Sequence, residues 1–189
     1  MAYLSEEDLK LIGFKAVGRN VKVSDKAAIY APELIEIGDN SRIDDFCIIS
    51  GKVSIGRHVH IAPHCLVAGG ELGITMGDFS GLAYFVQVFS QSDDYSGKTM
   101  TNPTVPKEYK NEYKAAVHLG RHVIIGAGSV IFPGVTVAEG CSVGALALVN
   151  KSTEAWGIYL GNPARRLRDR SRDLLKFEEK MQEENNDSI

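Results

Sequence analysis

The sequence predicts an all-β parallel solenoid, in which three short strands form each turn around a narrow aliphatic interior. Two observations predict this fold. Aliphatic residues recur at every sixth position through most of the chain, and small residues stand at fixed places between them. Neither the two-residue period of a half-exposed strand nor the 3.6-residue period of a helix produces a strict spacing of six.

The aliphatic repeat falls into three phased blocks. The second block follows a slip of three residues, and the third follows a longer interruption. The repeating positions are Ile37, Ile43, Ile49, Ile55, Ile61 and Val67; then Met76, Leu82 and Val88; then Leu119, Ile125, Ile131, Val137, Val143 and Val149. Because all of them are aliphatic, we expect their side chains to fill the interior.

Glycine follows many of these aliphatic residues, and a small residue such as Ser41, Ser80 or Ser129 often stands four places on. A strand of a few residues followed by a tight corner explains both features, because a corner favours small residues or a positive φ. Three such strands make a coil of about 18 residues, and coils stack at about 4.8 Å. About five to six coils fit the repeat.

Both ends of the solenoid need a cover, because an open coil exposes its core and a strand edge. Residues 1–20 are expected to form the N-terminal capping segment, with Ser5 as a helix N-cap and Gly13 as its stop. Residues 21–162 are expected to form the solenoid. Residues 163–189 are expected to form a C-terminal helix over 164–184 and a tail that frays from Glu183.

The repeat is interrupted by a loop over residues 89–118, which contains several aromatic residues and the run T-N-P-T-V-P. A loop this long in a regular solenoid is usually functional or disordered, and its composition favours order. We therefore expect part of a functional site here.

Composition excludes some classes of function. Among 189 residues the formal charge is −3 and the pI is about 6.0, which argues against nucleic acid or an anionic membrane as the main partner. No apolar run reaches the length of a membrane span, and the start lacks the pattern of a signal peptide. We expect a cytoplasmic location, in which Cys47, Cys65 and Cys141 are buried thiols.

The aliphatic–Gly–x–x–small–x pattern over roughly residues 21–167 resembles the hexapeptide-repeat acyltransferase family. The resemblance implies a left-handed β-helix that transfers an acetyl group from acetyl-CoA to a sugar. It also implies a homotrimer in which the long loop reaches the neighbouring subunit and completes an active site between chains.

The family resemblance places a coenzyme A site on the C-terminal coils. The repeated steps Gly126-Ala127 and Gly144-Ala145 put small residues at exposed corners, where a pantetheine arm can meet backbone groups. The run Asn162-Pro163-Ala164-Arg165 resembles the family's terminal motif beside the adenine and the phosphates, and the arginines would bind phosphate oxygens. The implied cofactor-binding set also includes Asn150, Lys151, Arg166 and Arg168. The plainer alternative is that the small residues only let the coils turn, and that the arginines are a solvated face.

The acceptor site lacks the histidine that the family's O-acetyltransferases use as general base at the start of the loop, because no histidine occurs between Cys65 and Val117. Either Asp93 or Asp94 replaces it, or the acceptor is an amine, which attacks a thioester without prior deprotonation. The loop also resembles those of bacterial acetyltransferases acting on nucleotide-linked amino sugars in O-antigen synthesis, which favours N-acetylation. The alternative for the S-D-D-Y-S-G run is simple turn chemistry.

The remaining candidates surround this loop. His118 ends the loop and is a further catalytic candidate, whereas His58, His60, His64 and His122 are expected to be corner residues and not metal ligands. We expect acceptor contacts from Tyr84, Gln91, Ser92 and Tyr95. Two rival functions stay open: sugar O-acetyl transfer, and a non-catalytic β-helix that binds or assembles.

Overall fold

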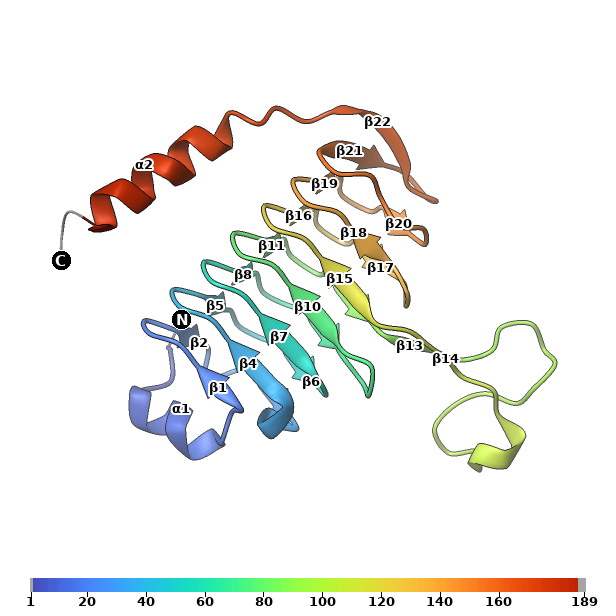
Figure 1. The fold of residues 1–189 in the computed structure, drawn as a ribbon. Helices are drawn as coiled ribbons and strands as arrows, with labels where there is room; N and C mark the ends of the chain where they lie inside the picture. The colour runs from blue at the N-terminus through green and yellow to red at the C-terminus, as the bar shows by residue number, and fades with distance from the viewer. Residues whose placement is uncertain (1, 187–189) are drawn as a thin grey trace.

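The six-residue repeat folds into three parallel sheets, one on each face of a long prism, in a computed structural model that describes residues 2–186 (Figure 1). The first face contains β1 (Ala16–Val17), β4 (Ile35–Ile37), β7 (Val53–Ile55), β10 (Ile74–Met76), β15 (Val117–Leu119) and β18 (Thr136–Val137). The second face contains β2 (Lys22–Val23), β5 (Arg42–Ile43), β8 (His60–Ile61), β11 (Gly81–Leu82), β16 (Ile124–Ile125), β19 (Ser142–Val143), β21 (Gly157–Leu160) and β22 (Arg165–Asp169). The third face contains β3 (Ala28–Tyr30), β6 (Ile48–Ser50), β9 (Leu66–Ala68), β12 (Gln87–Phe89), β17 (Val130–Ile131) and β20 (Leu148–Val149).

The parallel solenoid predicted from the repeat is confirmed, with one more turn than expected. Seven parallel strands lie on the second face of the described chain, whereas the repeat indicated about five to six coils. The difference arises mainly at the start, because the first turn begins at Ala16, well before the first aliphatic hexad at Ile37.

Three corners join the faces, and we name them by the faces that they connect. The first corner joins the first and second faces at residues 18–20, 38–40, 56–58, 77–79, 120–122 and 138–140. The second corner joins the second and third faces at residues 44–46, 62–64, 83–85, 126–128, 144–146 and 161–163. The third corner leads back to the first face and carries the insertions, namely the short 3₁₀ turn Pro32–Leu34, the segment 69–73 and the long loop.

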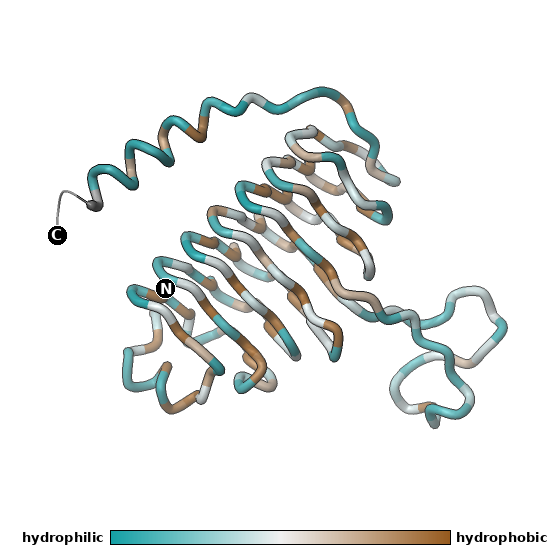
Figure 2. Tube along the Cα trace, in the orientation of Figure 1, coloured by the Kyte–Doolittle hydropathy of each residue, from teal (hydrophilic) through white to brown (hydrophobic). Residues whose placement is uncertain are grey.

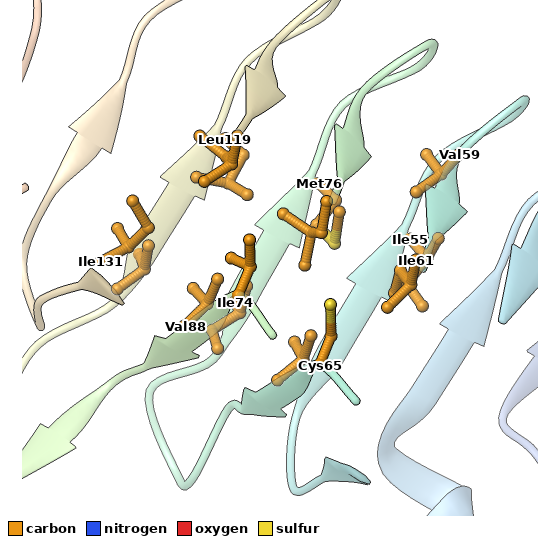
Figure 3. Close-up of a cluster of buried hydrophobic side chains, with 14 of the residues drawn as sticks. Ile55, Val59, Ile61, Cys65, Ile74, Met76, Val88, Leu119 and Ile131 are labelled. Carbon is orange, nitrogen blue, oxygen red and sulfur yellow. The ribbon is translucent and has the colours of Figure 1, made fainter. Parts of the chain in front are cut away.

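The interior of the prism is the predicted aliphatic column. All fifteen hexad positions are buried, with at most 3% of each residue exposed. Figure 3 shows part of this column, in which Ile55, Met76 and Leu119 from successive turns of the first face follow one another. The three cysteine thiols are also buried, as expected. Figure 2 shows the brown apolar segments recurring turn after turn, while the projecting loop is mostly pale or teal.

The N-terminal cover is the predicted helix α1 (Glu6–Ile12). Ser5 caps it through a hydrogen bond from the Asp8 backbone N–H to the Ser5 hydroxyl, and Gly13 ends it in the left-handed conformation with φ 79°. Leu9 packs into the core cluster, so the helix closes the first turn.

The C-terminal segment differs from the expected helix over 164–184. Residues Arg165–Asp169 form β22, which runs antiparallel to β21, and α2 (Leu174–Asn186) begins only afterwards. The reason is the edge of the last turn: β21 would present unpaired backbone groups there, and β22 pairs with them. From β22 the chain turns back, and α2 runs alongside the prism toward the earlier turns (Figure 1). Of the residues expected to fray, Glu183 to Asn186 belong to α2, and residues 187–189 lie outside the described part.

The long loop leaves the third corner and projects away from the prism (Figure 1). Its base is a two-stranded antiparallel ribbon of β13 (Gln91–Ser92) and β14 (Tyr113–Lys114), and its tip contains the 3₁₀ turn Lys107–Tyr109. No helix within residues 2–186 is long and apolar enough to cross a membrane.

Candidate active site

The second corner of the last turns is built from small residues stacked at very close range. Gly126-Ala127 and Gly144-Ala145 occupy this corner in consecutive turns, as the repeat predicts. A Cβ added to Gly126 would lie 2.5 Å from the Ala145 backbone nitrogen, so glycine is required for this stacking. The result is a narrow edge at which an extended ligand can reach backbone groups.

The Asn162-Pro163 step continues the same corner in the last turn. The Gly161 carbonyl accepts a hydrogen bond from the Leu148 N–H at 3.1 Å, and the Leu148 carbonyl accepts one from the Ala164 N–H at 2.8 Å. The bond between Asn162 and Pro163 is cis. Seven of the predicted donor residues therefore form one continuous line along the second corner, which we call the donor line: Gly126, Ala127, Gly144, Ala145, Asn162, Pro163 and Ala164.

The arginines beyond this line are not equivalent. Arg165 and Arg168 lie on β22 with exposed side chains. The Arg166 guanidinium instead contacts the Asp169 carboxylate and lies 3.6 Å from the Glu154 carboxylate, and hydrogen bonding to Asp169 raises the pKa of Arg166. This leaves Arg165 and Arg168 as the better placed of the three for phosphate oxygens.

Asn150 and Lys151 do not join the donor line. They follow β20 at the third corner, whereas Ala127, Ala145 and Asn162 lie at the second corner. Within one chain, the structure therefore separates them from the rest of the predicted coenzyme A set by the width of the third face.

The two aspartates lie in the projecting loop just after β13. The Asp94 carboxylate accepts hydrogen bonds from the Ser96 N–H at 2.8 Å and from the Thr99 hydroxyl at 2.9 Å. These bonds lower the pKa of the Asp94 carboxyl. The turn geometry considered for this run is therefore present, and Asp94 is part of it. Asp93 is half-buried, and its carbonyl accepts a hydrogen bond from the Ser92 hydroxyl at 3.2 Å.

The acceptor candidates divide between two places. Gln91 and Ser92 form β13 opposite Lys114 and Tyr113, and Tyr95 is almost fully exposed on the loop. Tyr84 lies on the second corner instead, one turn before the donor line, and its carbonyl accepts a hydrogen bond from the Gly128 N–H at 2.9 Å.

His118 belongs neither to the projecting loop nor to the second corner. It is the central residue of β15 on the first face, where its neighbours in register are Thr75 and Thr136. Its side chain is exposed on the outside of the prism. The sequence predicts that His118 ends the loop, but the residue lies in β15, where its side chain faces solvent.

The other histidines mostly form a corner ladder. His58 and His122 adopt positive φ at the first corner and stack on either face of Phe79, with ring centroids 4.9 and 5.1 Å apart. His64 stacks in the same way at the second corner. His60 is an exception to the expected corner position, because it lies in β8 and contacts the buried Asp44 carboxylate at 2.8 Å.

A groove between the second face and α2 was not anticipated from the sequence. It has a volume of about 690 Å³, and its walls include Gly81, Tyr84, Ile124, Phe177 and Met181. The helix is held there by Glu178, whose carboxylate contacts the His122 Nε2 at 2.7 Å and the Arg121 guanidinium. Sequence reasoning missed this groove because its two sides are distant in the sequence, with His122 and Glu178 56 positions apart, and share no repeat.

Comparisons with known proteins identify the chain's relatives. The family model of bacterial transferase hexapeptide repeats (six repeats) matches residues 35–69. A dTDP-4-amino-4,6-dideoxy-D-glucose acyltransferase from Escherichia coli is 44% identical over 181 residues, which cover 94% of each chain. The crystal structure of AntD, an N-acyltransferase from Bacillus cereus, in complex with dTDP and 3-hydroxybutyryl-CoA is 47% identical, with a TM-score of 0.96 over 97% of this chain and 98% of that chain.

A more distant structure shares the fold alone. A maltose O-acetyltransferase from Clostridium difficile 630 is 23% identical, with a TM-score of 0.57 over 88% of this chain and 75% of that chain. The stronger likeness, to acyltransferases along nearly the whole length, confirms the resemblance drawn from the repeat and the prediction of an enzyme. The chain belongs to the hexapeptide-repeat acyltransferase family.

Proposed function

We propose that this protein is an N-acyltransferase that moves an acetyl group from acetyl-CoA to the amino group of a dTDP-linked amino sugar. The observation that carries the proposal is the 44% identity, over 94% of both chains, to an acyltransferase named for dTDP-4-amino-4,6-dideoxy-D-glucose. The product would serve O-antigen synthesis, and the enzyme would work in the cytoplasm, where acetyl-CoA is made.

The donor is assigned to the second corner. Pantetheine would lie along Ala127, Ala145 and Asn162, which follow one another on this edge because Gly126 lets the turns stack closely. Arg165 and Arg168 stand beyond its end and would hold the phosphates. The thioester would then lie toward the earlier turns, at the corner that Tyr84 occupies.

The reaction with an amine needs little from the protein beyond positioning. The neutral amine attacks the thioester carbonyl carbon, a C–N bond forms, and the C–S bond breaks. The amine proton passes to the departing sulfur, so a strong base is less important than it is for a hydroxyl acceptor. This fits a loop that carries aspartates where the O-acetyltransferases carry a histidine.

A homotrimer would bring the loop of one subunit to the donor line of the next. Within one chain the loop leaves the third corner, whereas the donor line follows the second corner, and the loop projects away from its own prism (Figure 1). If the loop of one subunit lies against the second corner of the next, Asp93 and Asp94 come to the thioester of the neighbour. Light scattering of the purified protein tests the trimer directly.

The decisive assay is acyl transfer with acetyl-CoA and a panel of acceptors. We expect turnover of dTDP-4-amino-4,6-dideoxyglucose and none of simple galactosides. Turnover of hydroxyl acceptors alone would overturn N-acylation in favour of sugar O-acetylation. No binding of CoA by calorimetry would favour a non-catalytic β-helix. Including 3-hydroxybutyryl-CoA tests the size of the acyl group, since AntD was crystallised with that thioester.

Single Asn replacements test the two aspartates, with Thr99→Val as the matched control. Thr99 contacts the Asp94 carboxylate, so its loss disturbs the same turn without removing a carboxyl group. If Asp94 acts on the amine, Asp94→Asn lowers kcat far more than Thr99→Val does. Equal effects of the two variants would mean that Asp94 only shapes the loop.

A further inference from the structure

Hydrogen bonds that run through three successive third corners join the projecting loop to the prism. The Ser90 hydroxyl, just before β13, donates to the Gly69 carbonyl of the preceding turn at 2.6 Å. The Ala115 N–H, just after β14, donates to the Ser90 carbonyl at 2.9 Å, and the Gly134 N–H of the following turn donates to the Ala115 carbonyl at 3.3 Å. The ribbon of β13 and β14 therefore leaves the prism from a base that is bonded on either side.

The ring of Tyr113 rests on the third corner of the following turn. A Cβ added to Gly134 would lie 2.9 Å from the Tyr113 hydroxyl oxygen and 3.2 Å from the Ala115 Cβ. The hydroxyl therefore lies against the bare side of this glycine, whose φ of 80° also disfavours other residues. The ring limits how far the ribbon can tilt toward the following turn, because a closer approach would overlap with backbone atoms.

Lys114 ties the ribbon to the preceding turn. Its ammonium group lies 3.3 Å from the Glu71 carboxylate, in the segment 69–73, and 3.8 Å from the Glu112 carboxylate within the loop. Glu112 also contacts the Lys110 ammonium group at 3.0 Å, and the Lys110 side chain is only 7% exposed. Hydrogen bonding to Lys110, together with the charge of Lys114, lowers the pKa of the Glu112 carboxyl. Charges of alternating sign thus run from the prism into the loop, and such a network constrains direction more than one exposed pair does.

The two aspartates follow directly on this ribbon. Ser92, the partner of Tyr113 in the ribbon, is the residue before Asp93 and Asp94. Any rotation of the ribbon about its base therefore moves both carboxylates. A misplacement of about 1 Å at a reacting group can cost about 100-fold in rate, so the contacts at the base have consequences at the aspartates.

We propose that Tyr113 and Lys114 are positioning residues that fix the direction of the loop, and through it the place of Asp93 and Asp94 at the donor line of the neighbouring subunit. Figure 1 shows the loop leaving the prism through the ribbon that carries both residues. Neither side chain has to touch a substrate for this role. The inference rests on the proposed function, since it concerns how the loop of one subunit reaches the thioester held by another.

The test removes each contact without changing the aspartates. Lys114→Met keeps the length of the side chain but removes its charge, and Tyr113→Ala removes the ring. Lys114→Arg and Tyr113→Phe are the conservative variants, because they keep the charge and the ring. Lys176→Met is the matched control, since Lys176 also makes an exposed ion pair, with Asp173 at 3.0 Å, but lies in α2.

A distance measurement reports the direction of the loop separately from the activity. Spin labels are attached at Lys10→Cys in α1 and Tyr95→Cys in the loop, two exposed positions, and the native thiols are buried. The labelled chain is co-expressed with an excess of chain that lacks the introduced cysteines, so the distance within one subunit dominates. Each variant is made in this background for distances and in the wild-type background for kcat and for the KM of acetyl-CoA.

We expect one narrow distance distribution without further substitution, and a broader or shifted one with Lys114→Met or Tyr113→Ala. In both variants kcat should fall at least about tenfold, while the KM for acetyl-CoA stays within about twofold because the donor line is untouched. Lys114→Arg and Tyr113→Phe should recover most of the rate, and Lys176→Met should match the wild type. Unchanged distance distributions in both variants would overturn the inference, as would an equal loss of kcat in Lys176→Met.

The two proposals fail in distinguishable ways. If the wild-type enzyme acylates the amino sugar but Lys114→Met and Tyr113→Ala keep its kcat, the positioning role is wrong and the activity stands. If the wild-type protein acylates no nucleotide-linked amine, the proposed function itself is wrong, and the positioning role falls with it.

Discussion

Ser80 gives a sharp test of how the corners of this solenoid are stabilised. Among residues 2–186, its hydroxyl is the buried side-chain oxygen without a hydrogen-bond partner. Ser41 occupies the same place in an earlier turn, yet its hydroxyl donates to the Gly56 carbonyl at 2.8 Å and accepts from the Val59 N–H at 3.0 Å. Ser80→Ala removes a buried hydroxyl without a partner, whereas Ser41→Ala removes one that makes two hydrogen bonds.

The expected changes in the free energy of unfolding have opposite signs. A buried hydroxyl without a partner costs about 1–3 kcal/mol, so Ser80→Ala removes a penalty and leaves a small gap. The adjacent turns already place Val59 and Val123 at the equivalent position, which shows that an apolar side chain suits it. We expect Ser80→Ala to stabilise by about 1 kcal/mol and Ser41→Ala to destabilise by about 1–2 kcal/mol, because it leaves two backbone groups unpaired.

Urea unfolding followed by circular dichroism measures both variants at one protein concentration, since assembly would make the midpoint depend on concentration. The melting temperature should rise by about 2–4 °C for Ser80→Ala and fall for Ser41→Ala. If Ser80→Ala destabilises as much as Ser41→Ala, the Ser80 hydroxyl makes a hidden hydrogen bond and the reasoning is refuted.

Three further predictions concern the site. Gly126→Ala should lower the melting temperature by several degrees and abolish CoA binding in calorimetry, because the added Cβ would lie 2.5 Å from the Ala145 nitrogen. A wild-type affinity for CoA would contradict the close stacking. Glu178→Gln should speed amide hydrogen exchange in α2 but not in the prism, because the carboxylate that contacts His122 is lost. Unchanged exchange in α2 would show that other contacts hold the helix. The lowered pKa of Asp94 keeps its carboxylate ionised through neutral pH, so its hold on the loop is constant there and is lost only as the pH falls through that lowered value. The pH profile of kcat should therefore show no inflection from Asp94 between about pH 5 and 8. An inflection in that range that disappears in Asp94→Asn would contradict the prediction.

The repeat predicted the interior of the molecule almost residue by residue. An aliphatic side chain every six residues has one physical solution, in which each strand contributes an inward side chain before the chain turns a corner. The cap at Ser5 was also readable, because its signals are local. The stacking of Gly126-Ala127 and Gly144-Ala145 followed from the same repeat, since corners at a fixed spacing lie above one another; their role in binding coenzyme A stays a prediction.

What the sequence did not reveal depends on contacts between distant segments. The run Arg165–Asp169 is polar and has no strand alternation, so only the unpaired edge of β21 makes it a strand. The contact between Glu178 and His122 joins residues 56 positions apart and leaves no local pattern.

The even stacking of turns fixes the distances between residues along the prism. Successive turns are separated by about 4.8 Å, and this step cannot stretch without breaking the ladder of backbone hydrogen bonds. The distance from Tyr84 to Arg165 is thus set by a whole number of turns and not by the flexibility of any linker. Inserting or deleting one complete turn there would keep the chain folded while moving Arg165, the proposed phosphate anchor, by one increment, so the donor would no longer match the distance between Arg165 and Tyr84.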